Sequence, residues 1–223
     1  MNKAIRILLS IPKTVVLNFR LFPLRQAVKL PLFISYDTDV SVKGRVELPV
    51  DVPVKTAMIR FGFLCALACD TNSKSRLVVK RNGVLRFMGE AHLGHGTRLV
   101  VREGAEAVLG DNFAISSNTT IQCYNKVQFG KNVQFSWECL LMDSDTHKII
   151  GPDGEVMNPD APVIVGDNVW IGSRVTILKG VRIPDDTVIG ACSLVVSDKD
   201  LTDHSVIAGQ PARSIRTVSG WKL

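Results

Sequence analysis

Hydrophobic positions between Val165 and Val195 recur every six residues. An aliphatic series is followed, four residues after each member, by a series of small or β-branched side chains. An amphipathic helix repeats at about 3.6 residues and a half-buried strand at about 2, so neither element explains this period. It predicts a parallel β-helix, in which stacked coils fill one narrow core. The two series are Val165, Ile171, Ile177, Ile183, Ile189 and Val195, and Val169, Val175, Val181, Thr187 and Ser193.

The same period continues upstream in broken form. We interpret the slips of phase between its runs as irregular turns or small insertions. The sequence therefore predicts an all-β solenoid that begins well before residue 100 and forms one domain over residues 31–216, with a short tail at 217–223. The runs are Phe87, Leu93 and Leu99, then Leu109, Ile115, Ile121 and Val127, then Phe129, Phe135 and Leu141.

Residues 142–164, MDSDTHKIIGPDGEVMNPDAPVI, interrupt the period. Loops held by a rigid scaffold often carry catalytic residues. Of the four histidines, only His147 closely follows two acidic residues, Asp143 and Asp145. Histidine can act as a base near neutral pH, and a carboxylate can hold its tautomer. We interpret His147 as a candidate base oriented by one of these aspartates, with a preference for Asp145; the alternative is an ordinary solvent-exposed histidine.

The amino-acid composition agrees with the thin core of a solenoid and with a reducing cellular compartment. Hydrophobic residues make up 46% of the 223 residues and aromatic residues only 6%, which suits a solenoid better than a globular core. The five cysteines are odd in number and contain no CxxC pair, so we expect neither a disulfide framework nor a zinc knuckle. The expected location is the cytoplasm, and no resident metal is expected.

A formal net charge of +6 favours anionic partners such as phosphorylated cofactors or an anionic membrane. A nucleic-acid partner is not expected, because no basic patch interleaved with aromatic residues occurs. Residues 1–30 mix apolar residues with six Lys or Arg and predict a basic amphipathic helical segment. Two roles stay open for it: covering the open end of the solenoid, or peripheral contact with the inner face of a membrane. No apolar run approaches the roughly 18 residues of a transmembrane helix.

Three stretches carry a resemblance to a known family: DNVWIGSRVTILKGVRIPDDTVIGACSLVVSD, DSDTHKI and VIAGQPARSIR. They resemble the hexapeptide-repeat acyltransferases, in particular the galactoside, maltose and polysaccharide O-acetyltransferases. The resemblance implies a left-handed parallel β-helix, a homotrimer, acetyl-CoA as co-substrate and a sugar or glycan precursor as acceptor. It also implies direct transfer of the acetyl group, with clefts between subunits as active sites.

The resemblance assigns roles to individual residues. His147 falls on the general base. Trp170, Ser173 and Ala191 fall on positions that border the acceptor and CoA, and Arg213 and Arg216 fall where the phosphate end lies. Lys199 lies two residues beyond the family's Thr-Lys pair, which is here Val196 and Ser197, so the phosphate contacts are open. The acceptor-binding positions match only by neighbourhood, so the acceptor need not be a galactoside or maltose; they are Ser116, Asn118, Tyr124 and Asn125.

Three rival interpretations have weaker support. A carbonic-anhydrase-like zinc enzyme needs three histidines at a subunit interface, and only His92 and His95 lie suitably close in sequence. A nucleotidyltransferase would need a βαβ unit before the glycine-rich stretch Gly94–Leu99, and the chain has no such pattern there. A catalytically inactive trimeric scaffold is the third, although the loop with His147 and the AGQPAR ending argue against it.

Overall fold

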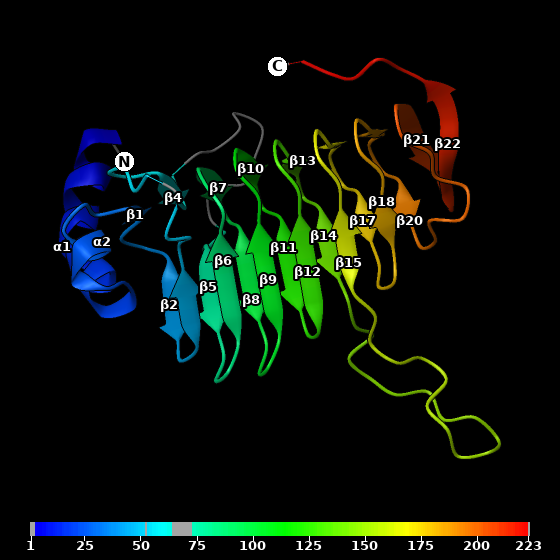
Figure 1. The fold of residues 1–223 in the computed structure, drawn as a ribbon, viewed down its shortest axis with the longest axis horizontal. Helices are drawn as coiled ribbons and strands as arrows, with labels where there is room; N and C mark the ends of the chain where they lie inside the picture. Colours follow the sequence, from blue (N-terminus) through cyan, green and yellow to red (C-terminus); the bar gives the residue numbers. More distant parts are fainter. Residues whose placement is uncertain (1–2, 52, 64–72, 223) are drawn as a thin grey trace.

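The computed structural model describes residues 3–51, 53–63 and 73–222. Its body is a three-sided rod in which the chain passes repeatedly from sheet A to sheet B to sheet C (Figure 1). Every pairing between successive coils is parallel, so the predicted parallel β-helix is confirmed. No helix of the described segments has the length and apolarity needed to cross a bilayer.

The strands form three sheets, one on each side of the rod. Sheet A holds β1 (Leu32–Ile34), β4 (Ile59–Phe61), β7 (Ala91–His95), β10 (Phe113–Ser117), β13 (Gln134–Trp137), β16 (Trp170–Ile171), β19 (Val188–Ile189), β21 (Ser205–Gly209) and β22 (Ala212–Thr217). Sheet B holds β2 (Asp39–Val42), β5 (Arg76–Val79), β8 (Arg98–Val101), β11 (Thr120–Cys123), β14 (Leu140–Met142), β17 (Thr176–Ile177) and β20 (Leu194–Val195). Sheet C holds β3 (Arg45–Glu47), β6 (Val84–Phe87), β9 (Glu106–Leu109), β12 (Lys126–Phe129), β15 (Val163–Val165) and β18 (Arg182–Ile183).

The two series of the repeat have the predicted positions. Ile171, Ile177 and Ile183 point inward from three successive sides and are fully or almost fully buried. The second series, which includes Val175 and Val181, is buried where the chain turns between sheets. The breaks in the six-residue period upstream arise because the coils there are longer. Trp170 pairs with Val188, so that coil has 18 residues, whereas Ile115 pairs with Phe135, so that coil has 20. The extra residues lengthen the turns and leave the inward positions in register.

The edge between sheets C and A is held by a ladder of polar side chains. Asn112, Asn132 and Asn168 adopt positive φ angles there, a conformation that asparagine tolerates better than most residues. Their side-chain amides bond from coil to coil, Asn112 to Asn132 at 2.9 Å and Asn132 to Asn168 at 3.1 Å. The ladder ends on Asp186, whose carboxylate accepts from Asn168 at 3.1 Å.

Helix α1 (Lys3–Leu21) covers the N-terminal end of the rod, and the short helix α2 (Leu24–Ala27) follows it. The side of α1 that faces β1 carries polar residues, contrary to the usual arrangement. Asn18 accepts from the Leu32 amide at 3.0 Å and donates to the Leu32 carbonyl at 2.7 Å, and Thr14 accepts from the Ile34 amide at 3.1 Å. These side chains form hydrogen bonds with the unpaired edge of β1. The helix therefore covers the open end of the solenoid, which is one of the two roles considered for this segment.

At the C-terminal end the chain reverses direction. Strand β22 pairs antiparallel with β21 and forms the last strand of sheet A. The tail then runs back along the rod (Figure 1). The Trp221 indole donates to the Asn168 carbonyl at 2.7 Å and fixes the tail over the edge between sheets C and A.

Candidate active site

The segment between β14 and β15 is a long arm that projects from the edge between sheets B and C (Figure 1). Ile150 and Val156 form an antiparallel bridge across the arm, and the Met157 amide donates to the Ile149 carbonyl at 2.9 Å. The arm is therefore a narrow hairpin. Its side chains Ile149, Ile150 and Met157 are apolar yet exposed.

His147 lies near the base of this arm and borders a hollow of about 360 Å³. The Tyr124 side chain, predicted to contact the acceptor, lines the same hollow, together with Ser144, Thr146 and Asn158. The His147 Nδ1 lies 3.0 Å from the Thr146 hydroxyl. A hydroxyl that accepts from Nδ1–H leaves the lone pair on Nε2, the tautomer that a base needs.

Neither aspartate orients the His147 ring in this chain. Asp145 accepts instead from Lys179 Nζ at 2.6 Å and from Asn158 Nδ2 at 2.8 Å, and the Lys179 contact lowers the pKa of its carboxyl. Asp143 is fully buried and accepts from the Tyr124 and Asn125 amides at 2.6 and 2.8 Å. Burial raises the pKa of Asp143, against the effect of these amide bonds. Both carboxylates hold the arm to the rod.

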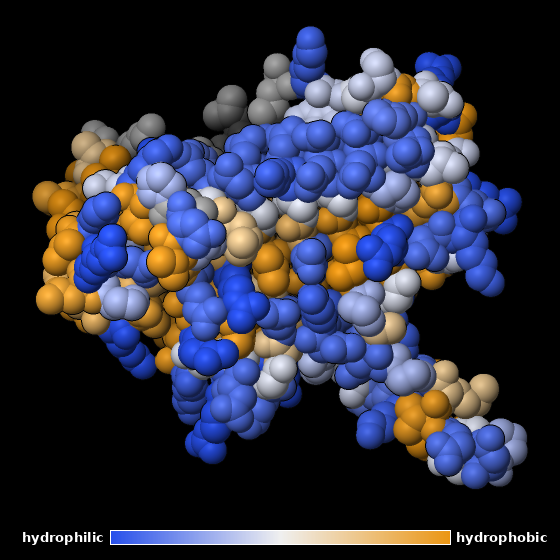
Figure 2. Space-filling model, viewed as in Figure 1, coloured by the Kyte–Doolittle hydropathy of each residue, from blue (hydrophilic) through white to orange (hydrophobic). Residues whose placement is uncertain are grey.

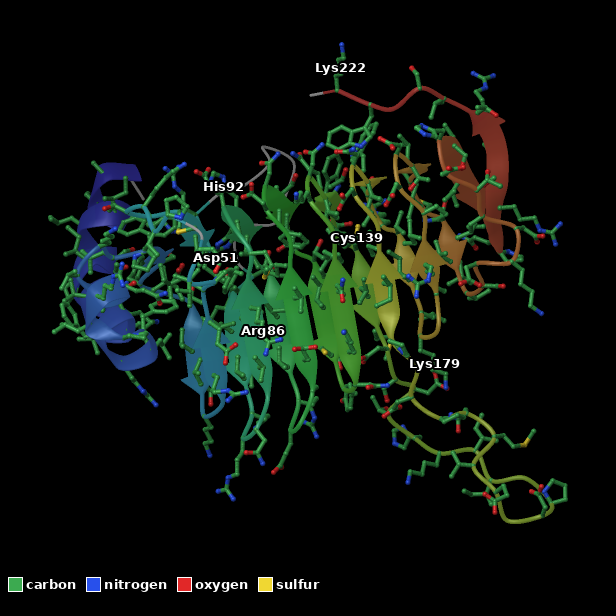
Figure 3. All side chains as sticks on the ribbon, in the orientation of Figure 1. Asp51, Arg86, His92, Cys139, Lys179 and Lys222 are labelled. Carbon is green, nitrogen blue, oxygen red and sulfur yellow. The ribbon has the colours of Figure 1, made fainter. Side chains whose placement is uncertain are left out.

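Lys179 is a residue that sequence reasoning missed. It follows β17, one coil beyond the arm, and lies at the root of the arm (Figure 3). Besides Asp145, its ammonium contacts the Asn158 carbonyl at 2.8 Å. Asn158 in turn donates to the His147 carbonyl at 2.9 Å. Lys179 therefore fixes the backbone that carries His147.

A second group of predicted residues lies on sheet A and on the edge between sheets A and B. Trp170 stands outward on β16, 42% exposed, and its indole donates to Ser136 Oγ at 3.2 Å. Ser173 and Ala191 occupy successive turns at the A–B edge, where the Ser173 carbonyl accepts from the Cys192 amide at 2.9 Å. Ser116 and Asn118 lie at the same edge, two coils before Ser173.

The predicted cationic residues do not form one cluster. Lys199 is exposed in the segment after β20. Arg213 lies on β22, 3.6 Å from the Asp200 carboxylate, and Arg216 is exposed on the same strand. Asn125 lies beside Tyr124 at the edge between sheets B and C. The structure thus brings His147, Tyr124 and Asn125 to one edge, and Ser116, Asn118, Ser173 and Ala191 to another.

The tail adds an aromatic residue that the sequence did not single out. The Trp221 ring lies 6.3 Å from the Trp170 ring, centroid to centroid, at 44°. With Asn132, Asn168 and Asp186 it borders a separate hollow of about 420 Å³.

The rival zinc site finds no support in the described residues, which contain no group of three potential ligands among His, Cys, Asp and Glu. His92 faces outward on β7, while His95 is buried with its Nδ1 3.0 Å from the Arg6 guanidinium. The glycine-rich stretch serves coil packing, because a Cβ on Gly94 would lie 1.8 Å from the Ser116 carbonyl oxygen. Of the cysteines, Cys65 and Cys69 lie outside the described residues.

Comparisons with known proteins agree with the repeat. Residues 162–197 match the family described as bacterial transferase hexapeptide (six repeats). The galactoside O-acetyltransferase of Escherichia coli strain K12 is 37% identical over 118 residues, 52% of this chain and 56% of that protein. A putative acetyltransferase of Saccharomyces cerevisiae is 33% identical over 116 residues, 52% of this chain and 58% of that protein. The chain spans little more than half the length of these relatives.

Among solved structures, the polySia-specific acetyltransferase NeuO has a TM-score of 0.56 at 19% identity, covering 86% of this chain and 79% of that one. At 19% identity, this structural similarity is evidence for the fold alone. Together with the repeat match, it confirms the left-handed parallel β-helix and the resemblance to hexapeptide-repeat acyltransferases.

Proposed function

We propose that this hexapeptide-repeat protein is an O-acetyltransferase that moves an acetyl group from acetyl-CoA to a hydroxyl of a sugar or glycan precursor, of the surface-polysaccharide type. The observation that carries the proposal is the division of the candidate residues between two edges. His147 and Tyr124 stand at the edge between sheets B and C, whereas Ser173 and Ala191 stand at the edge between sheets A and B. Sheet B separates the two edges within one chain, and we infer that two neighbouring copies bring the two groups onto one substrate.

In the proposed mechanism His147 acts as a general base. Its Nε2 takes the proton of the acceptor hydroxyl while the hydroxyl oxygen bonds to the acetyl carbonyl carbon. The carbon–sulfur bond then breaks, and the protonated His147 returns the proton to the leaving thiolate of CoA. The transfer is direct and needs no covalent intermediate on the protein. Thr146 supports the base by holding Nδ1.

The state of the described cysteines argues against a thiol nucleophile. Cys123 and Cys139 are buried, and burial raises the pKa of both thiols, that of Cys139 to about 11. A thiol that stays protonated is a poor nucleophile. The exposed Cys192 lies on the edge between sheets A and B, a different edge from the loop of His147, among the proposed CoA-binding positions.

Acetyl-CoA is proposed to lie along the edge between sheets A and B. The small side chains of Ser173 and Ala191 permit close approach of an extended ligand, and Trp170 offers an exposed ring beside it. Arg216 and Lys199 are exposed cations available to the phosphates, and Arg213 can join them by leaving Asp200.

The proposed assembly is a homotrimer with an active site at each interface. A neighbour seated against the arm would bury Ile149, Ile150 and Met157, which a lone chain exposes. The same neighbour would bring its Ser173 edge towards His147. Because three equal interfaces close a ring, each trimer would contain three identical sites.

The proposed acceptor is a sugar or glycan. The hollow beside His147 offers the Tyr124 ring together with polar groups of Ser144, Asn158 and Asp160, a mixture suited to stacking on and hydrogen bonding to a sugar. A relative named galactoside O-acetyltransferase supports this class of acceptor without fixing the sugar. The proposed location is the cytoplasm, at the inner face of the membrane, with residues 1–30 as the contact.

The test is thiol release from acetyl-CoA with a panel of sugar acceptors. His147→Ala should lower the rate by about 10²- to 10⁴-fold, the usual contribution of a general base. His204→Ala is the matched control, because His204 is exposed on another edge and its nearest acidic partner is Asp186 at 3.8 Å. A folded His147→Ala trimer with near wild-type activity would remove His147 from the mechanism.

A further inference from the structure

Helix α1 exposes a continuous apolar face at the end of the rod (Figure 2). Leu8 is 67% exposed, Val16 65% and Phe19 51%, all on the side away from β1. Leu24 in α2 extends the face and is 69% exposed. Single exposed apolar residues are common on soluble proteins, but a contiguous face marks an interaction site.

The body of the rod cannot cover this face. The opposite side of α1 is already bonded to the first coil, through Thr14 and Asn18 to β1 and through Ser10 to the Tyr36 amide, and all three side chains are buried. Arg6 adds an anchor, with its guanidinium 3.0 Å from the Asp37 carboxylate and 3.0 Å from Ser35 Oγ. Rotation of α1 to bury the apolar face would break these bonds, so the outward orientation is fixed.

The charged residues within the N-terminal segment are all basic, and an acidic neighbour of Arg25 and Lys29 is Asp51, which lines the same hollow as they do. No Asp or Glu occurs before Asp37, whereas the first 30 residues contain six Lys or Arg. Arg6 and Lys13 bond to the first coil of the rod, where Lys13 donates to the Tyr36 carbonyl at 3.1 Å. Arg20 is exposed, although its guanidinium also donates to the Val42 carbonyl at 3.3 Å, and Arg25 and Lys29 are exposed in and after α2.

We propose that the outward face of α1 and α2 binds an anionic lipid surface. The apolar side chains would enter the boundary between headgroups and acyl chains, while Arg25 and Lys29 meet the anionic headgroups. A second copy is a poorer occupant, because pairing two such faces brings two sets of cations together without any acidic residue from this segment. On this proposal α1 lies in the plane of the membrane–water interface, and it lacks the length and apolarity needed to cross a bilayer.

This inference deepens the proposed function, and its trimer rests on that proposal. In a parallel trimer all three α1 faces lie at the same end, so three weak contacts act together. The rod would then stand on the membrane by its N-terminal end. A glycan precursor attached to a lipid would approach the active sites from that end.

The test is sedimentation of the full chain with vesicles, without acetyl-CoA or acceptor. We expect binding to vesicles that contain phosphatidylglycerol, weaker binding at high salt, and little binding to vesicles of phosphatidylcholine alone. The variant Leu8→Gln/Phe19→Gln should weaken binding by about tenfold for each residue. The matched control is Met88→Gln/Ile215→Gln, which changes two exposed apolar residues elsewhere, 40% and 64% exposed.

Each outcome has one meaning. Selective loss in the α1 variant supports the inference, and His147→Ala should bind vesicles like the wild type. Absence of binding to anionic vesicles, or equal loss in the control variant, overturns it. So does a hexamer in light scattering that the α1 variant dissociates, because a second copy then covers the face. A monomer that still binds vesicles would refute the proposed trimer and leave the lipid contact standing.

Discussion

The Lys179 ammonium lies 2.6 Å from the Asp145 carboxylate, and this pair joins the root of the His147 arm to the next coil of the rod. Lys179→Met should leave the arm loose and lower kcat/KM for acetyl transfer by roughly ten- to a hundredfold, the cost of a poorly positioned catalytic group. Thermal unfolding should change little, because the arm is not part of the stacked coils. Lys55→Met is the control: it removes a 2.8 Å ion pair with Glu90 on the edge between sheets C and A, away from the arm and from the proposed acetyl-CoA positions, and should not change the rate. Equal losses in the two variants would contradict a positioning role for Lys179.

The same pair predicts how Asp145 titrates. Lys179, and then Asn158, lower the pKa of Asp145 below its ordinary value of about 3.9. A carboxyl whose pKa is lower in the folded state stabilises that state above its unfolded pKa, and the contribution is lost as the pH falls through the lowered pKa. The Asp145–Lys179 contact should therefore persist unchanged from neutral pH to about pH 5. The carboxyl ¹³C shift of Asp145 checks this, and Lys179→Met should return its midpoint towards the ordinary value.

Two inactive variants should complement each other if the site is shared between subunits. His147→Ala removes the base, and Ala191→Trp blocks the edge between sheets A and B, where Ala191 is exposed. Denaturing and refolding the two together should restore about a quarter of the wild-type activity, because a quarter of the interfaces then pair an intact His147 with an intact Ala191 edge. Each variant refolded alone is the control. No recovery in trimers shown to be mixed would place the site within one chain.

The cap of α1 should depend on the polarity of its inner side. Asn18→Leu has a similar size but leaves the Leu32 amide and carbonyl unpaired and buried. The free energy of unfolding should fall by about 2–4 kcal/mol, although a more apolar residue has been introduced. Val16→Gln, on the exposed side, should change it by less than about 0.5 kcal/mol. Chemical denaturation measures both, and an Asn18→Leu protein as stable as wild type would contradict this account of the cap.

The solenoid could be predicted because its signal is local. Each coil repeats its inward residues at fixed spacing, so Ile171, Ile177 and Ile183 alone indicate the three sides of one turn. The cap could not be predicted in the same way. A helical pattern normally places apolar residues inward, but the edge of β1 needs hydrogen-bond partners, and that requirement appears only once Leu32 and Ile34 have been placed.

The sequence indicated candidate residues for the site, but it did not indicate the contacts that those residues make. His147 was found from its loop and from a family resemblance. Its supposed partner Asp145 bonds instead to Lys179, 34 residues later in the chain, which only the stacking of coils brings near. Trp221 reaches the carbonyl of Asn168, 53 residues away, because the chain reverses at β22. Such contacts carry no period that a single sequence could reveal.

The polar inner side of α1 also has a consequence for how rods meet one another. A coil with a bare strand edge is a template on which another coil, from the same or a different molecule, can add. Thr14 and Asn18 occupy the donors and acceptors of β1 that an incoming strand would use, and Ser10 occupies the Tyr36 amide just after it. The solenoid therefore has a defined first coil, and three short polar side chains prevent further coils from adding to it and forming a filament.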